Sequence, residues 1–260
     1  MLKGRDQMAE IDNRYAHAGV AARTDVAVDE GLRAYMLRVY NYMAAGIALT
    51  GVVAYLTYAN AVVERGPAGR RVLTEFGQLI YTSPLRWVIM LAPLAFVFFL
   101  SWRIATMSVG AAQIAFWLFA AVMGASLSSI FLRYTATSIT QVFFVTAAAF
   151  GALSLYGYTT KKDLSGWGSF LIMGVFGIII AAIVNIFLQS SALQFAISVI
   201  GVLVFAGLTA YDTQRIKDGY YELMSDGAAL AKGAIMGALS LYLDFINMFT
   251  SLLSLFGNRE

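Results

Sequence analysis

Residues 239–249 read Leu-Ser-Leu-Tyr-Leu-Asp-Phe-Ile-Asn-Met-Phe, a stretch that sets one carboxylate, Asp244, inside an apolar run. The run extends over about 233–256, which is long enough for a helix to cross the roughly 30 Å hydrocarbon core of a bilayer. An aspartate near the centre of such a helix costs about 2.5–3.5 kcal/mol, so it usually faces the bundle interior and marks a site. Asp244 therefore predicts both a membrane helix and a buried functional group.

The composition of the whole chain is typical of a membrane protein. Hydrophobic residues make up 60% of it and charged residues 13%, and the mean hydropathy is +0.71. Soluble domains are nearer 45–50% apolar, and so few charges cannot cover a core of this size in water. The net charge of +3 is small and its basic residues are spread over the loops, so the lipid bilayer is the expected partner and nucleic acid is not.

Seven segments are long and apolar enough to span a bilayer. They cover about 35–58, 85–105, 110–132, 137–159, 167–188, 192–213 and 233–256. The predicted fold class is therefore all-α, an integral membrane bundle of seven transmembrane helices. Only a weak break at 132–137 separates the third and fourth segments, so a merged or shifted pair is an alternative. Small residues four apart, Gly124 with Ser128 and Gly233 with Gly237, indicate close helix packing.

Two parts of the chain are predicted. Residues 1–33 form a polar N-terminal tail, expected to be cytoplasmic and poorly ordered, and residues 34–260 form the seven-helix membrane domain. Loops on the side of the N-terminus carry more Lys and Arg than the opposite loops, which favours this orientation. Two connections are long: the charged linker 214–232, and 59–84, with a turn at 66–69 and an interfacial helix expected at 71–80.

The helix around Asp244 has one polar face. Ser240, Asp244, Asn247 and Ser251 follow one another at steps of four, three and four, so they lie on one side of it. Serine and asparagine there commonly form interhelical hydrogen bonds, and they are also candidates to line a pore. Because a neutral residue would make such bonds at lower cost, we expect Asp244 to be present for its charge.

A second aspartate, Asp212, ends the preceding apolar segment. It lies about one turn from Arg215, so one interpretation is an ordinary helix-end residue at the membrane interface. The other interpretation places it near the level of Asp244, which lies about 11 residues, or roughly 17 Å, into the last span. That contact requires span six to extend past Lys217 or span seven to begin after Lys232.

Two carboxylates that meet in a low dielectric cannot both ionise easily, so they share a proton and titrate as a coupled pair. Such a pair suits pH sensing and offers oxygen ligands to a hard cation such as Ca²⁺. We therefore predict Asp212 and Asp244 as a pair that senses pH or binds a cation such as Ca²⁺. Arg103, at the inner end of the second span, is a candidate latch for the pair, and the alternative is that it extends to lipid headgroups.

Other site chemistries are excluded or disfavoured. The chain has no cysteine, which excludes disulfides, thiolate catalysis and Cys-ligated metals, and its one histidine, His17, lies in the tail. No Ser–His, zinc or phosphate-loop pattern occurs, so we expect no enzyme and no cofactor, with Ca²⁺ as a permeant or bound ion. Presenilin-type proteases also use two membrane aspartates, but they need Gly-x-Gly-Asp where residues 241–244 read Leu-Tyr-Leu-Asp.

Two segments resemble a known family. Residues 205–217, Phe-Ala-Gly-Leu-Thr-Ala-Tyr-Asp-Thr-Gln-Arg-Ile-Lys, and residues 237–249, Gly-Ala-Leu-Ser-Leu-Tyr-Leu-Asp-Phe-Ile-Asn-Met-Phe, are similar to the last two helices of the Bax inhibitor-1 family. These are also called transmembrane Bax-inhibitor-motif proteins. Residues 160–165 and 38–46 support the resemblance, which covers about 33–257. It is to bacterial members, which implies the inner membrane.

The resemblance implies a bundle with the last helix central and a pH-sensitive Ca²⁺ leak across the membrane. In the family, the paired aspartates matched here by Asp212 and Asp244 gate the leak, and an arginine of the second helix, matched by Arg103, latches it. Family members often carry an acid within the second span, where residues 90–95 read Met-Leu-Ala-Pro-Leu-Ala, so a path through that acid is in doubt. The family permits a second hypothesis, a regulatory protein that binds a membrane protease or a stress-response partner.

Overall fold

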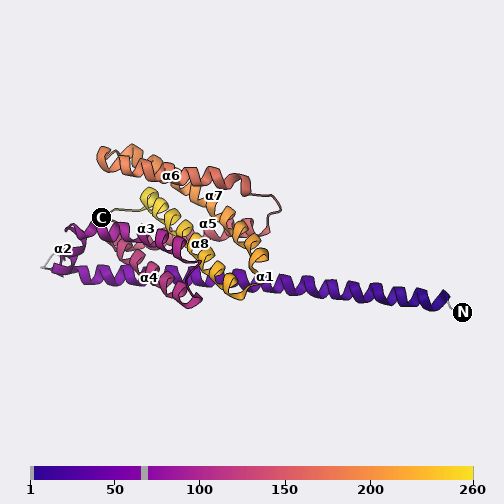
Figure 1. The fold of residues 1–260 in the computed structure, drawn as a ribbon. Helices are drawn as coiled ribbons and strands as arrows, with labels where there is room; N and C mark the ends of the chain where they lie inside the picture. Colours follow the sequence, from indigo (N-terminus) through magenta and orange to yellow (C-terminus); the bar gives the residue numbers. More distant parts are fainter. Residues whose placement is uncertain (1–2, 66–69, 260) are drawn as a thin grey trace.

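The computed structural model describes the backbone of residues 3–65 and 70–259, and the side chains of residues 28–63 and 71–259. The protein is a bundle of long helices with a short β-hairpin (Figure 1). Its elements in chain order are α1 Lys3–Ala61, β1 Val62–Arg65, β2 Arg70–Leu73, α2 Glu75–Tyr81, α3 Leu85–Arg103, α4 Val109–Leu127, the 3₁₀ turn η1 Ser128–Leu132, α5 Ala136–Thr159, α6 Ser165–Leu188, α7 Ser191–Leu223 and α8 Gly227–Phe256.

Seven helices in the described part of the chain are long and apolar enough to cross a membrane, which confirms the predicted fold class. The first of these spans begins at Val28 within α1, and the third joins α4 to η1. The uncertain break between the third and fourth spans is real, because Thr135 caps α5 by accepting a hydrogen bond from the amide of Ser138. Helix α1 continues across the tail boundary predicted at residue 33; the tail's order and compartment stay predictions.

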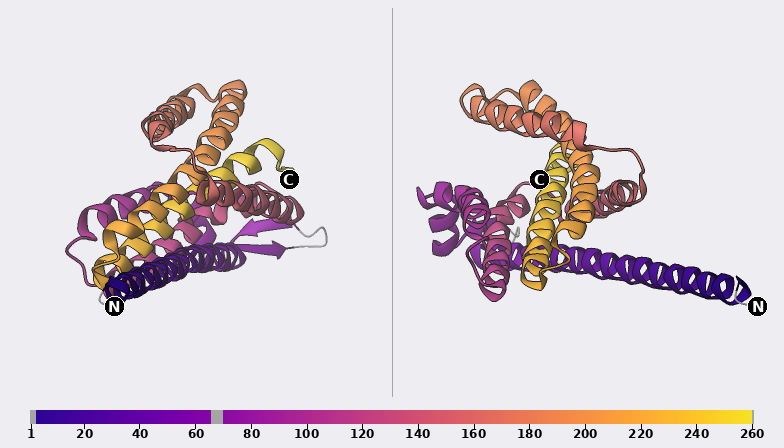
Figure 2. Two further views of the ribbon diagram at one scale, coloured as in Figure 1. Left: turned by 90° about the vertical axis from the view of Figure 1, so that its right-hand side faces the viewer. Right: turned by 45° about the vertical axis from the view of Figure 1, so that its right-hand side comes forward.

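Helix α8 is central, as expected. It passes between α5 and α7 on one side and α1 and α4 on the other (Figures 1 and 2). In its most apolar window, 50% of the residues are buried, against 6% in the peripheral α6. Its Tyr242 is fully enclosed, lies edge-on to Phe116 and Phe119, and shares a 2.6 Å hydrogen bond with Thr50 of α1. A buried tyrosine with a satisfied hydroxyl fixes the rotation of α8 within the bundle.

The outward faces are apolar, as contact with lipid requires. Phe187 at the end of α6 and Trp102 at the end of α3 are 82% and 81% exposed. In water, a surface of this kind would drive association, whereas lipid tails are as apolar as the side chains themselves. The bundle is therefore assembled by close packing and internal polar contacts.

Glycines mark the closest approaches between helices. A Cβ on Gly124 would meet the carbonyl of Thr50 in α1, and one on Gly237 would meet Ile216 of α7, which confirms the packing role predicted for these positions. Helices α5 and α7 also approach each other closely. There, a Cβ on Gly157 would collide with the carbonyl oxygen of Ala210, so the two backbones lie directly against each other.

The predicted linker 214–232 is wrong. Helix α7 continues to Leu223, and only residues 224–226 separate it from α8. The helix persists among the charges because every turn still has a side chain to bury. Ile216 and Tyr220 are both buried, and the Tyr220 ring lies 5.6 Å from that of Tyr35 in α1.

The connection 59–84 also differs from the prediction. Strands β1 and β2 pair antiparallel, with Val62 opposite Leu73 and Val63 opposite Val72, as β-branched residues favour. The helix expected at 71–80 starts only with α2, because Thr74 caps it by accepting a hydrogen bond from the Gly77 amide. The turn predicted at 66–69 lies outside the described residues.

Asp226 caps α8, and its substitution by Ala should lower the melting temperature of the protein. Its Oδ1 accepts hydrogen bonds from the amides of Ala229 and Ala228, and these bonds hold the pKa of the carboxyl below its ordinary value of 3.8. The carboxylate therefore contributes stability above pH 3.8, which is lost as the pH falls through the lowered pKa. Asp226→Asn keeps an acceptor and should match the wild type in thermal unfolding, with Asp226→Ala lower; equal melting of all three would contradict the cap.

Candidate functional site

Both predicted aspartates lie between α7 and α8, the most extensively packed helix pair in the bundle. Asp212 is 7% exposed and Asp244 is 3% exposed. The sequence placed the two aspartates at similar levels only if the helix of Asp212 extends past Lys217. Helix α7 does so, because it ends at Leu223. The interpretation of Asp212 as an interfacial helix-end residue is therefore replaced by one in which it belongs to the core.

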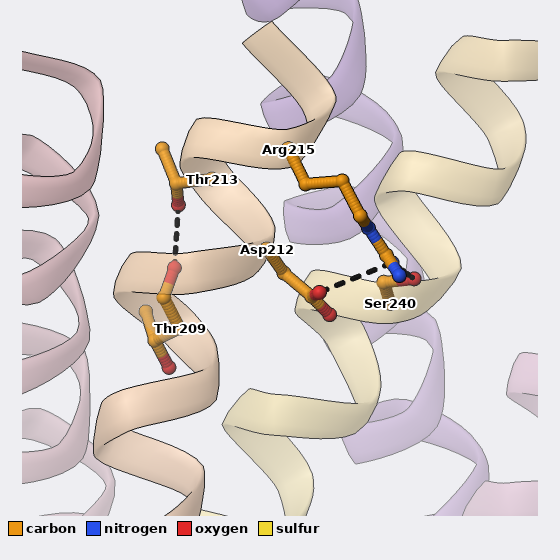
Figure 3. Close-up of polar contacts among 5 residues, drawn as sticks. All are labelled: Thr209, Asp212, Thr213, Arg215 and Ser240. Carbon is orange, nitrogen blue, oxygen red and sulfur yellow. Dashed lines mark hydrogen bonds and ion pairs between the residues drawn. The ribbon is translucent and has the colours of Figure 1, made fainter. Parts of the chain in front are cut away.

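Arg215 is the cation of this site. Its Nη2 lies 3.0 Å from Oδ1 of Asp212, and it donates a 3.3 Å hydrogen bond to the Ser240 hydroxyl of α8 (Figure 3). Ser240 precedes Asp244 by one helical turn, on the same face. One guanidinium therefore joins the carboxylate of α7 to the helix that carries the second carboxylate. The Arg215 side chain is 51% exposed, so this link is open to solvent or headgroups.

Asp244 differs from Asp212 in its surroundings. Its Oδ2 is buried and has no hydrogen-bond partner among the described residues. The charges that act on it most are those of Asp212 and Arg215. Buried polar atoms are nearly always satisfied, and an exception in a native fold calls for an explanation. The orphan oxygen is available to a proton or to a hard cation that enters the site.

A chain of hydroxyls lies behind Asp212. Thr213 donates to the carbonyl of Thr209 at 2.7 Å (Figure 3), so its oxygen accepts from Ser154 of α5 at 2.9 Å. Ser154 in turn accepts from Tyr40 of α1 at 2.6 Å. These bonds tie α1, α5 and α7 together beside the site. Sequence reasoning missed them, because single hydroxyls on apolar helices carry no sign of their partners.

The predicted pore-lining residues have different surroundings. Ser240 accepts from Arg215, whereas the Asn247 amide donates to the carbonyl of Leu243 in its own helix. Ser251 points toward α7, where a Cβ on Gly201 would lie 2.6 Å from its hydroxyl. All three are half-buried, on the face that the spacing predicted.

Arg103 is not brought to the aspartates. It is exposed at the last turn of α3, and none of the ion pairs found among the described residues includes it. Arg215 takes the position beside Asp212 because it follows by three residues on the same helix, within reach of one turn. The sequence signal for it was present, but it was read as a sign of the membrane interface.

The carboxylate pair alone offers few ligands to a metal ion. The described residues contain no group of three or more His, Asp or Glu side chains able to hold a metal ion. Ca²⁺ takes six to eight oxygens, so the pair would need water or backbone oxygens to complete its shell. Such a site suits an ion in transit better than a resident one.

The family model described as "Inhibitor of apoptosis-promoting Bax1" matches residues 32–260. This covers all seven membrane spans except the first four residues of the first. The chain belongs to the Bax inhibitor-1 family. The family resemblance expected from the two aspartate segments is thereby confirmed.

Relatives within the Bax inhibitor-1 family are bacterial. An uncharacterized protein of Caulobacter vibrioides is 49% identical over 97% of this chain and 100% of its own length. The inner membrane protein YbhL of Escherichia coli is 46% identical over 88% of this chain and 94% of its own. An uncharacterized membrane protein of Streptococcus pyogenes is 33% identical over 89% and 96%. The chain is a multi-pass protein of the bacterial inner membrane.

Proposed function

We propose that the protein is a pH-sensitive cation leak that passes Ca²⁺, gated by Asp212 and Asp244 and latched by Arg215. The observation that carries the proposal is the buried, unpartnered oxygen of Asp244, next to a second carboxylate already engaged by a cation. The proposal assigns no catalytic role and no resident cofactor to the pair. It rests on charge, burial and hydrogen bonding at one helix interface.

The proposed mechanism follows from the link that Arg215 makes. While Asp212 is ionised, the guanidinium holds it and Ser240 together, and α7 stays fixed to α8. Protonation of Asp212 removes the charge that holds Arg215, and the link between the helices weakens. A cation can then reach the Asp244 carboxylate from the solvent-exposed side of Arg215. The leak is therefore larger at pH 6 than at pH 8.

The test is Ca²⁺ flux into proteoliposomes measured across pH 6–8, with the wild type beside Asp212→Asn. An amide cannot hold Arg215 by charge, so we expect a raised flux that no longer changes with pH. Purified protein of each variant should elute as the same folded species before reconstitution. If Asp212→Asn conducts and responds to pH as the wild type does, the gating mechanism is wrong.

A comparison of two arginines identifies the latch. The Asp212–Arg215 pair is half exposed, and such pairs contribute about 0.5–1 kcal/mol, so Arg215→Gln should raise the leak at pH 8 by about two- to fivefold. Arg103→Gln removes the same charge on the same side of the bundle and should leave the flux unchanged. If Arg103→Gln raises the flux and Arg215→Gln leaves it unchanged, the latch is Arg103 and not Arg215.

A further inference from the structure

A groove on the flank of the bundle lies between α1 and α5, and neither aspartate lines it. It has a volume of about 900 Å³, and it is open along one side. Its α1 wall extends from Arg33 to Gly51, which at 1.5 Å per residue is about 27 Å. That is close to the roughly 30 Å thickness of the hydrocarbon core. Phe245 of α8 closes the back of the groove.

The polar groups that line the groove lie toward its Arg33 end, and the other end is apolar. Arg33 stands at one end, before Met36 and Leu37. Tyr158 of α5 also lines the groove, and its carbonyl accepts a 2.9 Å hydrogen bond from Nζ of Lys217. Next come hydroxyls, where Tyr40 and Ser154 hydrogen-bond across the groove at 2.6 Å. The remaining lining residues are apolar: Leu155 beside Ser154, and then Met43, Ala44, Ile47, Ala48, Gly51, Phe143, Ala147, Phe150 and Gly151.

We propose that this groove is a binding site for one anionic phospholipid of the leaflet on the Arg33 side. One end of the groove carries a cation and hydroxyl groups and the other end carries only hydrocarbon, as the phosphate and glycerol ester end of such a lipid differs from its acyl end. None of the described residues that line the groove is acidic. The Arg33 end is also the end that the distribution of Lys and Arg assigns to the cytoplasm. The lipid is therefore held by its phosphate at Arg33, with one acyl chain in the groove.

Small residues make room for the acyl chain. A Cβ built on Gly51 of α1 or on Gly151 of α5 meets no atom within 4 Å, so the backbone is bare on both walls. Other glycines of this bundle bring helices into direct contact, as Gly157 does six residues later on α5. The two groove glycines do the opposite, because they face a space that no side chain of the described protein fills.

The test uses the full chain in nanodiscs that contain phosphatidylglycerol and phosphatidylethanolamine, followed by native mass spectrometry of the lipid retained. We expect one phosphatidylglycerol per wild-type chain. Gly151→Phe should fill the groove and abolish the retention, because the new ring has no protein atom to displace. Gly177→Phe on the exposed face of α6, where a Cβ also meets nothing within 4 Å, should retain lipid as the wild type does.

Arg33→Gln separates headgroup recognition from general filling by lipid. A basic side chain near anionic lipid contributes about fivefold in affinity, so the preference for phosphatidylglycerol over phosphatidylethanolamine should fall by that factor. Lipid retention by Gly151→Phe equal to that of the wild type would overturn the site. An unchanged lipid preference in Arg33→Gln would overturn the anionic headgroup.

A cross-linking experiment tests whether a second chain occupies the groove instead. Because the chain has no cysteine, Gly151→Cys introduces a single cross-linking position. A disulfide between two copies at this position would show that a second chain occupies the groove and would overturn the lipid site.

Discussion

Asp244→Asn should leave the protein folded and abolish the dependence of its Ca²⁺ flux on pH. Two opposing contributions to the free energy of unfolding allow the fold to tolerate this substitution. An aspartate at the centre of a membrane helix costs about 2.5–3.5 kcal/mol, and the amide avoids that cost. The amide instead places N–H donors where Oδ2 has no partner, which costs about 1–3 kcal/mol. The two roughly cancel, so thermal unfolding should change little.

The functional effect of Asp244→Asn has no such compensation. The amide has the shape of the carboxyl, but it offers no charge to the cation that reaches this position once the Arg215 link has weakened. We expect the ratio of the flux at pH 6 to the flux at pH 8 to fall to about one, with the flux below the wild-type level at both. A proteoliposome assay over that range measures both quantities on the same preparation.

Asp163 provides the matched control. It is an exposed loop aspartate whose pKa is lowered by hydrogen bonds from the Ser165 side chain and from the Ser165 amide, which lies 2.8 Å from Oδ1 of Asp163. Asp163→Asn removes one negative charge from the same chain and should keep the pH response of the wild type. If Asp244→Asn responds to pH as this control does, the carboxylate at the centre of α8 is structural and not part of a gate.

Hydrophobic length and the cost of a buried charge made most of the fold predictable. Seven spans and the polar face of Ser240 and Asp244 follow from rules that act within one helix, whereas the central position of α8 was expected from the family resemblance. The extension of α7 did not follow, because the charged residues around Arg215 resemble a linker when they are read alone. What keeps this part of α7 helical is packing of Tyr220 against Tyr35, a contact 185 residues distant in sequence.

The site itself was only half predictable for a similar reason. Both aspartates could be identified from the sequence, since a carboxylate in an apolar run is conspicuous by its cost. The partner of Asp212 could not be chosen, because Arg103 and Arg215 both lie on the expected side of the membrane. Distance along the helix decides between them in the structure, where Arg215 reaches Asp212 at 3.0 Å. The hydroxyl chain through Ser154 depends on three helices at once and has no local pattern.

Gly157→Leu should prevent the correct assembly of α5 on α7. Even a Cβ at this position would collide with the carbonyl oxygen of Ala210, and a backbone atom cannot rotate away as a side chain can. The helices would have to separate, which breaks the 2.9 Å bond between Ser154 and Thr213 and shifts the segment that carries Asp212. Overpacking costs about 1–3 kcal/mol, and we expect the upper end of that range. For a chain of this size, about 3 kcal/mol lowers the melting temperature by roughly 6–12 °C.

Gly151→Leu makes the same change on the same helix and should not destabilise the protein. Its Cβ meets no atom within 4 Å, so the added side chain enters open space in the groove between α1 and α5. Thermal unfolding of both variants in the same detergent compares the same Gly→Leu substitution at a crowded position and at an open one. A melting temperature of Gly157→Leu equal to that of Gly151→Leu would mean that the close approach of α5 to α7 is absent in the membrane. The proposed positioning of Asp212 would then lose its structural support, because that approach fixes α7 two residues before the carboxylate.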